Sequence, residues 1–234
     1  MLSLNKFFND VNLIAFTSDA TVDYTLDETL PRLTESKSQA LAQLIGASFN
    51  NLACVRQIHG ADVVEVDEAF IGQNELKQAD ALISNRGNIL VAVRTADCLP
   101  VFLWDPIHRA LGVVHAGWKS TQKEILKQTY VAMADRYQTH AQDLMVAFGP
   151  AIRNCCYQVS EEFKSFFPEA TLVKDGALYM DLIKANGDQL NELGIQRKKL
   201  FDSNICTVCS PGYFSFRRDG SKAGRMLSGM LIKG

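Results

Sequence analysis

The stretch Arg94-Thr-Ala-Asp-Cys-Leu-Pro-Val-Phe-Leu-Trp-Asp-Pro-Ile-His-Arg-Ala-Leu-Gly-Val-Val-His-Ala-Gly-Trp-Lys-Ser120 decides how this chain is interpreted. Two apolar runs, rich in β-branched and aromatic residues, flank Asp105-Pro106-Ile107-His108. Asp at the first position of a turn and Pro at the second suit a type I turn. The pattern therefore predicts a β-hairpin.

Cys98 and His115 are the chemically notable residues of this hairpin. If Trp104 pairs with Arg109 across the turn, the same register places Cys98 opposite His115, with Cβ atoms roughly 5 Å apart. A thiolate and an imidazole at that separation can share a metal ion, or act as nucleophile and base. The alternative is a small apolar cysteine beside a hydrogen-bonded core histidine. Asp97 and a nearby glycine favour a site, because functional residues concentrate at loops on a rigid scaffold.

The composition is that of an ordinary globular protein. The chain has 234 residues, of which 47% are apolar and 21% charged, and we expect one domain over residues 1–234. The net charge of −2 argues against non-specific nucleic-acid binding. We find no signal peptide and no apolar stretch of membrane-spanning length, so we expect no membrane association and a cytoplasmic location. The six cysteines should then be reduced.

Apolar periodicity predicts a mixed α/β fold. A capping-box pair, Thr121 with Glu124, should start a helix that runs to Tyr137, and Asp181 should cap another helix. A further helix is expected over 36–45. Strands are expected at 11–17, 51–58, 63–66, 79–84, 89–95, 144–148, 199–208, 213–217 and 226–232 in addition to the hairpin.

His59, Cys98 and His115 form a possible set of metal ligands, since each ends or interrupts a predicted strand. Two histidines and one cysteine leave a fourth position for water, as a catalytic zinc requires. Zinc would lower the pKa of that water to about 7. Copper accepts the same ligands, but a blue-copper site also has a weak axial Met, and nothing in the sequence marks one.

For several other polar or cysteine-containing segments, a purely structural role is the alternative to a functional one. Lys119 lies where a helix is expected to start, and could help to bind an anion or simply flank a cap. Arg217 and Arg218 precede a turn. They could bind an anion between them, or they could simply be solvated. Cys155 and Cys156 could line a site, although burial is the favoured interpretation. The CxxC at 206–209 has no evident second ligand pair for a structural zinc, so we assign it a purely structural role.

Several enzyme classes are excluded by absent motifs. The chain has no P-loop and no GxGxxG fingerprint, which argues against common nucleotide-binding folds. It lacks the paired H-x-E and P-C-x-x-C motifs of the zinc nucleobase deaminases. It also lacks the G-x-S-x-G elbow of the α/β-hydrolases.

Six blocks of sequence, in a specific order and spacing, resemble one known family. They are Gln57-Ile-His-Gly-Ala-Asp-Val63, Ala79-Asp-Ala-Leu-Ile83, Thr95-Ala-Asp-Cys-Leu-Pro100, His115-Ala-Gly-Trp118, Gly149-Pro150 with Cys155-Cys-Tyr157, and Phe214-Ser-Phe-Arg-Arg-Asp-Gly220 with Gly224-Arg-Met226. Over residues 50–234 the chain resembles the YfiH-type purine nucleoside phosphorylase family, once called multicopper polyphenol oxidases or laccase-domain proteins.

The resemblance implies a four-layer α/β sandwich with mixed sheets and a zinc ion held by His59, Cys98 and His115. It implies phosphorolysis of purine nucleosides (adenosine, inosine, guanosine or methylthioadenosine) and hydrolytic deamination of adenosine. The partners would be a purine nucleoside and phosphate. Because phosphorolysis needs an anion site, the family favours Lys119 with Arg217 or Arg218 as phosphate-binding residues.

Three positions depart from the family pattern. An FSTRxGG-like segment near the N-terminus is here Phe16-Thr-Ser-Asp-Ala-Thr-Val22, without the arginine or the glycines. The arginine that usually follows His-Ala-Gly-Trp is Lys119, which keeps the charge but loses the bidentate fork. Arg153 occupies a position at which the family usually has glycine. One hypothesis is that Arg153 replaces the missing N-terminal arginine.

Other functions are compatible with the same residues. Cys98 and His115 could serve as nucleophile and base of a cysteine hydrolase, and related proteins are linked to peptidoglycan editing. A copper-dependent polyphenol oxidase is suggested by the old family name, but the ligand set is small for a multicopper centre. A binding protein that keeps the metal without turnover is a further alternative. Neither nucleoside preference nor oligomeric state is indicated by the sequence.

Overall fold

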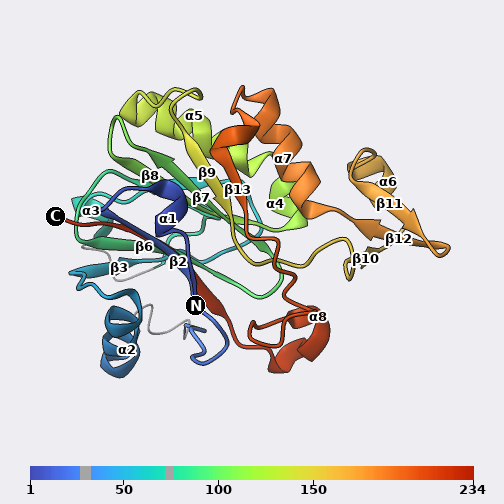
Figure 1. Ribbon diagram of the computed structural model, residues 1–234, viewed down its shortest axis with the longest axis horizontal. Coiled ribbons are helices and arrows are strands. Elements are labelled where there is room, and N and C mark those ends of the chain that lie inside the picture. The colour runs from blue at the N-terminus through green and yellow to red at the C-terminus, as the bar shows by residue number, and fades with distance from the viewer. Residues whose placement is uncertain (27–32, 72–75) are drawn as a thin grey trace.

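The computed structural model describes residues 1–26, 33–71 and 76–234, and it contains two large β-sheets that pack face to face (Figure 1). In the described residues, the six-stranded sheet has the order β13 (Leu200–Asp202), β9 (Met145–Phe148), β7 (Leu99–Asp105), β8 (Ala110–Ala116), β5 (Ala81–Ser84) and β4 (Val63–Glu65). The five-stranded sheet has the order β1 (Leu2–Ser3), β2 (Leu13–Thr17), β14 (Met226–Ile232), β6 (Ile89–Thr95) and β3 (Asn51–Ala53).

Helices cover the outer faces of both sheets. Helices α5 (Ile125–Tyr137) and α7 (Leu182–Glu192) lie over the six-stranded sheet, and α2 (Glu35–Ile45) lies over the five-stranded sheet (Figure 1). Short helices α1 (Asn5–Phe8), α3 (Glu68–Ile71), α4 (Trp118–Gln122) and α8 (Phe216–Asp219) lie at the ends of strands or between them. The order helix, sheet, sheet, helix confirms the four-layer α/β sandwich implied by the resemblance.

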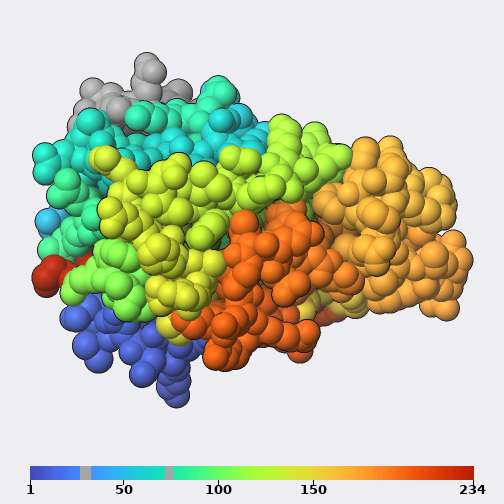
Figure 2. Space-filling view, turned by 90° about the horizontal axis from the view of Figure 1, so that it is seen from above, coloured from blue at the N-terminus to red at the C-terminus, as the bar shows by residue number. Residues whose placement is uncertain are grey.

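A third, small sheet projects from one end of the molecule. Its strands are β10 (Gln158–Val159), β12 (Ala177–Met180) and β11 (Thr171–Lys174), and it carries the short helix α6 (Phe163–Phe166). Figures 1 and 2 show this segment standing out from the body of the two large sheets. None of the helices in the described part of the chain is long and apolar enough to cross a membrane.

The central hairpin β7–β8 is buried on both faces, which explains its continuous apolar sequence. Val101 and Leu103 face the helix side, where they pack with α5 and α7. Phe102 and Trp104 face the other sheet, where they pack against the inner face of β2, β6 and β14. Because each face of a strand takes alternate side chains, a strand covered on both sides needs apolar residues at every position.

The predicted hairpin is confirmed, but its predicted register is wrong by two residues, so that Pro100 rather than Cys98 lies opposite His115. Trp104 pairs with Leu111 rather than with Arg109, and the ladder closes with Asp105 opposite Ala110. Asp105 stays in the strand because its carboxylate accepts hydrogen bonds from the backbone N–H groups of Ile107 and His108. Arg109 then takes a left-handed conformation (φ 50°) to lead the chain into β8.

Two other local predictions fail, one because of a tertiary contact and one because of a local helix cap. The capping box at Thr121 does not form: α4 already begins at Trp118, α5 begins only at Ile125, and Thr121 instead exchanges hydrogen bonds with Asn186 of α7. The strand expected at 213–217 is replaced by helix α8, which Ser215 caps by accepting a hydrogen bond from the Arg218 backbone. The predicted cap at Asp181 is confirmed by its bond to the Lys184 backbone.

Candidate metal centre and cavity

His59, Cys98 and His115 lie together in the structure although they come from three separate elements. His59 lies in the loop after β3, Cys98 lies immediately before β7, and His115 is in β8. Their ligand atoms all lie within 4.8 Å of one another, and Cys98 Sγ is 3.8 Å from His59 Nε2. His115 is the most buried of the three and His59 the most exposed. This group can hold a metal ion with one side open.

Asp80, which directly precedes β5, holds both histidines in position. Its fully buried carboxylate accepts hydrogen bonds from the backbone N–H groups of Ile58 (3.2 Å), His59 (3.0 Å) and Gly60 (2.6 Å). These bonds hold His59 in a left-handed backbone conformation (φ 56°) that presents its ring to the site. The same carboxylate bonds the Nδ1 atom of His115 at 2.7 Å. With Nδ1 taken up by Asp80, Nε2 of His115 is left for a metal or for Cys98.

The pKa values of Cys98 and His115 reflect their mutual contact. Burial alone would raise the pKa of the Cys98 thiol, but the charge and hydrogen bond of His115 outweigh burial and lower that pKa to about 6. Burial would likewise lower the pKa of His115, but the Cys98 thiolate and the Asp80 carboxylate raise that pKa to about 9. Without a metal, the two groups therefore form a thiolate–imidazolium pair at neutral pH.

Gly117 leaves room for His59 and Cys98 to lie close together. A Cβ atom at this position would lie 3.0 Å from His59 Cδ2 and 3.1 Å from Cys98 Sγ. Any larger residue would have to displace one of the two ligands, so the glycine in His-Ala-Gly-Trp has a steric role at the site.

Asp97, the residue before Cys98, ties the site to two distant loops. Its backbone has a left-handed conformation (φ 89°), which turns Cys98 away from the end of the β7 ladder. Its carboxylate accepts hydrogen bonds from the Thr207 hydroxyl and from the Arg217 backbone N–H, both at 2.6 Å. Its carbonyl accepts a hydrogen bond from the Ile152 N–H. The loops around Ile152 and Thr207 thus form a wall beside the site.

The three ligands open into a cavity of about 970 Å³, a size within the range of small-molecule sites. Its lining is rich in arginine and lysine, whereas Asp97 is the only acidic side chain among the described residues that line it. The basic lining residues are Arg56, Arg94, Lys119, Arg217 and Arg225. Such a lining favours an anionic ligand.

Lys119 and Arg217, which the family resemblance favours as phosphate-binding residues, both line this cavity. The Lys119 ammonium lies 5.5 Å from the centre of the Trp118 ring. The Arg217 guanidinium lies 5.3 Å from the centre of the Tyr157 ring and donates a hydrogen bond to the Gln158 carbonyl. Both charges therefore stand beside aromatic rings at the cavity wall.

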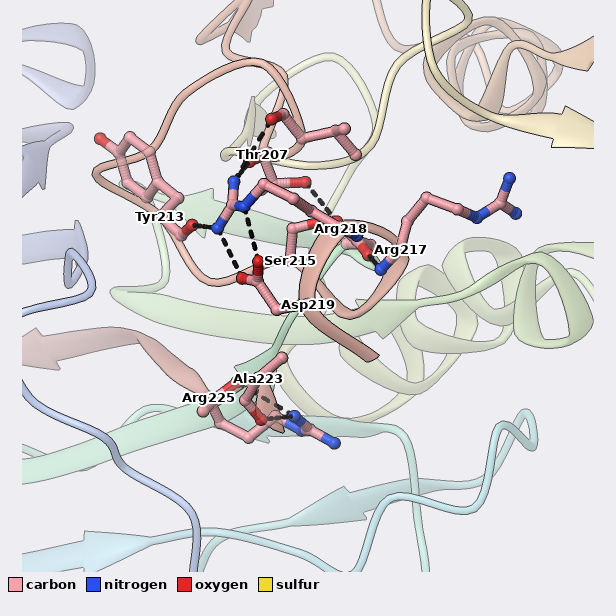
Figure 3. Close-up of polar contacts among 11 residues, drawn as sticks. Thr207, Tyr213, Ser215, Arg217, Arg218, Asp219, Ala223 and Arg225 are labelled. Atoms are coloured by element: carbon pink, nitrogen blue, oxygen red, sulfur yellow. Dashed lines mark hydrogen bonds and ion pairs between the residues drawn. The ribbon is translucent and has the colours of Figure 1, made fainter. Parts of the chain in front are cut away.

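Arg218 is not brought to the cavity. Its guanidinium forms a two-bond ion pair with Asp219 and donates to the carbonyls of Thr207, Val208 and Tyr213. Figure 3 shows Arg218 enclosed by these groups, while the side chain of Arg217 extends away from them. The contacts give Arg218 a role in holding its loop rather than in binding a ligand.

Arg153 does not replace the missing N-terminal arginine. It forms a bidentate ion pair with Asp202, with both N–O distances 2.7 Å, and it is not among the residues that line the cavity. Additional positive charge at the cavity comes instead from Arg56, Arg94 and Arg225. Sequence reasoning gave them no role, although Arg94 lies at the end of a predicted strand, one residue before its last, and Arg225 lies in a block that carries the family resemblance.

Replacing Asp80 by asparagine should weaken metal binding by about 10-fold to 100-fold, because the partner that orients His115 loses its charge. The matched control is Asp105→Asn, which alters a similar buried pair, His108 Nδ1 to Asp105 Oδ2 at 2.8 Å, at the far end of the hairpin. Competition with a chromophoric chelator would measure both affinities. Equal losses in the two variants would contradict a specific role for Asp80.

The metal-free protein should contain a Cys98 thiolate at neutral pH. Because the pKa of Cys98 is about 6 rather than the ordinary 9.0, its alkylation rate should rise as pH increases through 6 and then level off. In His115→Gln the midpoint should move to higher pH, since the largest charge that opposes the effect of burial on the Cys98 pKa is then lost. Alkylation by iodoacetamide, followed at the Cys98 peptide by mass spectrometry, measures this midpoint. An unchanged midpoint in the variant would refute the pairing.

Comparison with known proteins agrees with this architecture. The chain is 38% identical over 194 residues to a purine nucleoside phosphorylase of Clostridium acetobutylicum, covering 80% of this chain and 79% of the relative. It is 30% identical to adenosine deaminase RL5 from an unknown prokaryotic organism, covering 94% and 88%. The crystal structure of YlmD from Geobacillus stearothermophilus superposes with a TM-score of 0.84 at 25% identity, covering 96% of this chain and 93% of YlmD.

A similar match, with a TM-score of 0.81, 26% identity and coverage of 94% and 93%, is found for the YfiH protein of Bacillus licheniformis. The family described as multi-copper polyphenol oxidoreductase laccase matches residues 27–233. The chain therefore belongs to this YfiH-type, laccase-like family, as its motifs suggested.

Proposed function

We propose that this protein is a zinc-dependent purine nucleoside enzyme that catalyses phosphorolysis of purine nucleosides and deamination of adenosine. The observation that carries the proposal is the His59, Cys98 and His115 group at one side of a cavity lined with basic and aromatic residues. The named activities of the matched relatives, purine nucleoside phosphorylase and adenosine deaminase, agree with it.

Zinc fits the donor set better than copper. Tetrahedral zinc with nitrogen and sulfur ligands places those ligand atoms roughly 3.5 to 3.8 Å apart, and the distance from Cys98 Sγ to His59 Nε2 is 3.8 Å. No methionine is among the described residues that line the cavity, so a weak axial ligand for blue copper is not at hand. The chemistry that zinc supplies in a three-ligand group is Lewis acidity and a coordinated water of lowered pKa.

The basic side chains of the cavity are suited to phosphate. Arg217 and Lys119 offer charged donors at the wall. The Nε atom of Arg94 is buried and has no hydrogen-bond partner among the described residues, which an anion in the cavity could provide. Burial lowers the pKa of Arg94, but an arginine remains charged at neutral pH. We therefore assign the phosphate subsite to these three residues, with Arg218 outside it.

Aromatic side chains give the cavity a surface for a purine ring. Trp118, Tyr157 and Phe216 all line it, and Phe216 is 54% exposed. Trp118 is held by its packing on Phe163 and Phe166 of α6, with ring centres 5.0 Å and 6.0 Å apart. Large flat rings beside cationic groups suit a ligand that has an aromatic base and binds next to an anion.

The protein's own groups would orient the reaction. Asp80 bonds Nδ1 of His115, which fixes the imidazole tautomer that leaves Nε2 directed at the metal position. Gly117 and Asp97 keep the ligands and the cavity wall in place. Because this chemistry depends on a reduced Cys98, we expect the protein to work in the cytoplasm.

A cysteine hydrolase is the second candidate, and one observation favours it. The Cys98 thiolate, His115 and Asp80 form a chain of contacts that could activate a nucleophile without any metal. Metal content distinguishes the two functions, since a bound metal would occupy the thiolate.

Metal analysis combined with nucleoside assays tests the main proposal. Protein purified without a chelating tag should contain zinc, which Cys98→Ala should remove from this centre, together with activity. The unaltered protein should release adenine from adenosine only when phosphate is present, and inosine whether or not phosphate is present. Two results together would favour the second candidate instead. The His59 group would contain no zinc, and the protein would hydrolyse amide substrates in a reaction that alkylation of Cys98 abolishes.

Arg217→Met should separate the two reactions. Loss of charged hydrogen bonds to phosphate should raise the KM for phosphate by about 10-fold to 100-fold, because such bonds contribute roughly 1.5 to 3 kcal/mol. Adenosine deamination uses no phosphate and should change much less. The matched control is Arg197→Met, an exposed arginine of the 3-10 helix η1 (Arg197–Lys199) away from the cavity. Equal losses in both reactions would argue against a phosphate-binding role.

A further inference from the structure

Four of the six cysteines form a second cluster, separate from the His59 group. Cys155 and Cys156 follow β9, and Cys206 and Cys209 follow β13. Their sulfur atoms all lie within 4.8 Å of one another. The sequence interpretation of the CxxC segment as lacking a second ligand pair is therefore wrong, because the second pair is Cys155-Cys156, some fifty residues earlier in the chain. The prediction that Cys155 and Cys156 are buried is also wrong for Cys155, whose side chain is exposed.

Backbone hydrogen bonds between the two loops bring the cysteines together. Ala151 and Cys206 form a parallel β-bridge, in which the Ala151 N–H donates to the Ile205 carbonyl and the Thr207 N–H donates to the Ala151 carbonyl. The Ser210 N–H then donates to the Cys206 carbonyl and closes a turn that places Cys209 beside Cys206. Main-chain pairing thus holds the four thiols close together.

The distances between the sulfur atoms match a tetrahedral thiolate site. Cys156 Sγ lies 3.3 Å from Cys209 Sγ, and Cys155 Sγ lies 3.8 Å from Cys209 Sγ. Four sulfur atoms at about 2.3 Å from a zinc ion lie roughly 3.8 Å from one another. A disulfide requires about 2.05 Å and would use only two of the four sulfurs. The cluster thus has the number of ligands and the spacing of a closed, structural zinc site.

The cluster lies at the protein surface. Cys206 is buried and Cys156 is half-buried. Cys155 and Cys209 are exposed, so an ion can reach the cluster from solvent.

We propose that Cys155, Cys156, Cys206 and Cys209 bind a second zinc ion, whose role is structural. The ion would cross-link the two loops that form the wall of the cavity. Cys156 immediately precedes Tyr157, which lines the cavity. Thr207 lies between the other two cysteines and donates to Asp97 beside Cys98. The metal would therefore hold the wall next to the first metal centre without touching substrate.

The two sites can be counted separately by metal analysis. If each site holds one zinc ion, the unaltered protein should contain about two zinc ions per chain. The Cys98→Ala variant should contain about one, and so should the double variant Cys206→Ser with Cys209→Ser. Cys54→Ser, a buried cysteine outside both groups, is the matched control and should leave the content unchanged. Zinc that disappears completely in Cys98→Ala would overturn the proposal.

Cobalt replacement in the Cys98→Ala background tests the ligands without altering the four cysteines. Co²⁺ bound by four thiolates should give intense visible and sulfur-to-metal charge-transfer absorption, and removal of the metal by a chelator should lower the melting temperature. Weak absorption typical of oxygen ligands would overturn the proposal, as would a Cys156–Cys209 disulfide found by mass spectrometry of the unreduced protein. If the His59, Cys98 and His115 group binds no metal, these results should be unchanged. The two proposals can therefore be refuted independently of each other.

Discussion

The Asp80 carboxylate is the contact on which the candidate metal centre depends. It is fully buried, it accepts three backbone N–H bonds from the loop that carries His59, and it bonds Nδ1 of His115. A buried carboxylate is costly unless it is well bonded, and these partners keep the pKa of Asp80 below its ordinary value despite burial. One charge thus fixes the position of one ligand and the tautomer of another.

Asp97 has the corresponding role on the other side of Cys98. Its bonds to Thr207, Arg217 and Ile152 join the end of the central hairpin to the two loops that carry the four-cysteine cluster. The proposed first metal centre, the proposed phosphate subsite at Arg217 and the proposed second zinc are consequently parts of one connected wall. Side chains that are distant in sequence are held within a few ångströms because the sheets behind them are rigid and buried.

Much of the fold was predictable because periodicity and capping are local. β6 and β14 have the predicted bounds, the turn of the β7–β8 hairpin was placed within one residue, and the cap of α7 was identified. The wrong predictions arose where a polar side chain formed a hydrogen bond that the apolar periodicity and the capping pattern do not encode. Asp105 capped the turn from within the strand, and Thr121 bonded Asn186 instead of capping its own helix.

By itself, the sequence determined the mixed α/β class, the central hairpin and the three metal-ligand candidates, because residue type and order specify local structure. The sandwich followed from the family resemblance of its motifs. Only the tertiary structure separated Arg217, at the cavity, from Arg218, which is bonded within its loop. It also brought Arg94 and Arg225 to the cavity and joined Cys155 and Cys156 with the distant CxxC. These outcomes depend on which loops pack side by side, and that is decided by long-range backbone pairing rather than by spacing along the chain.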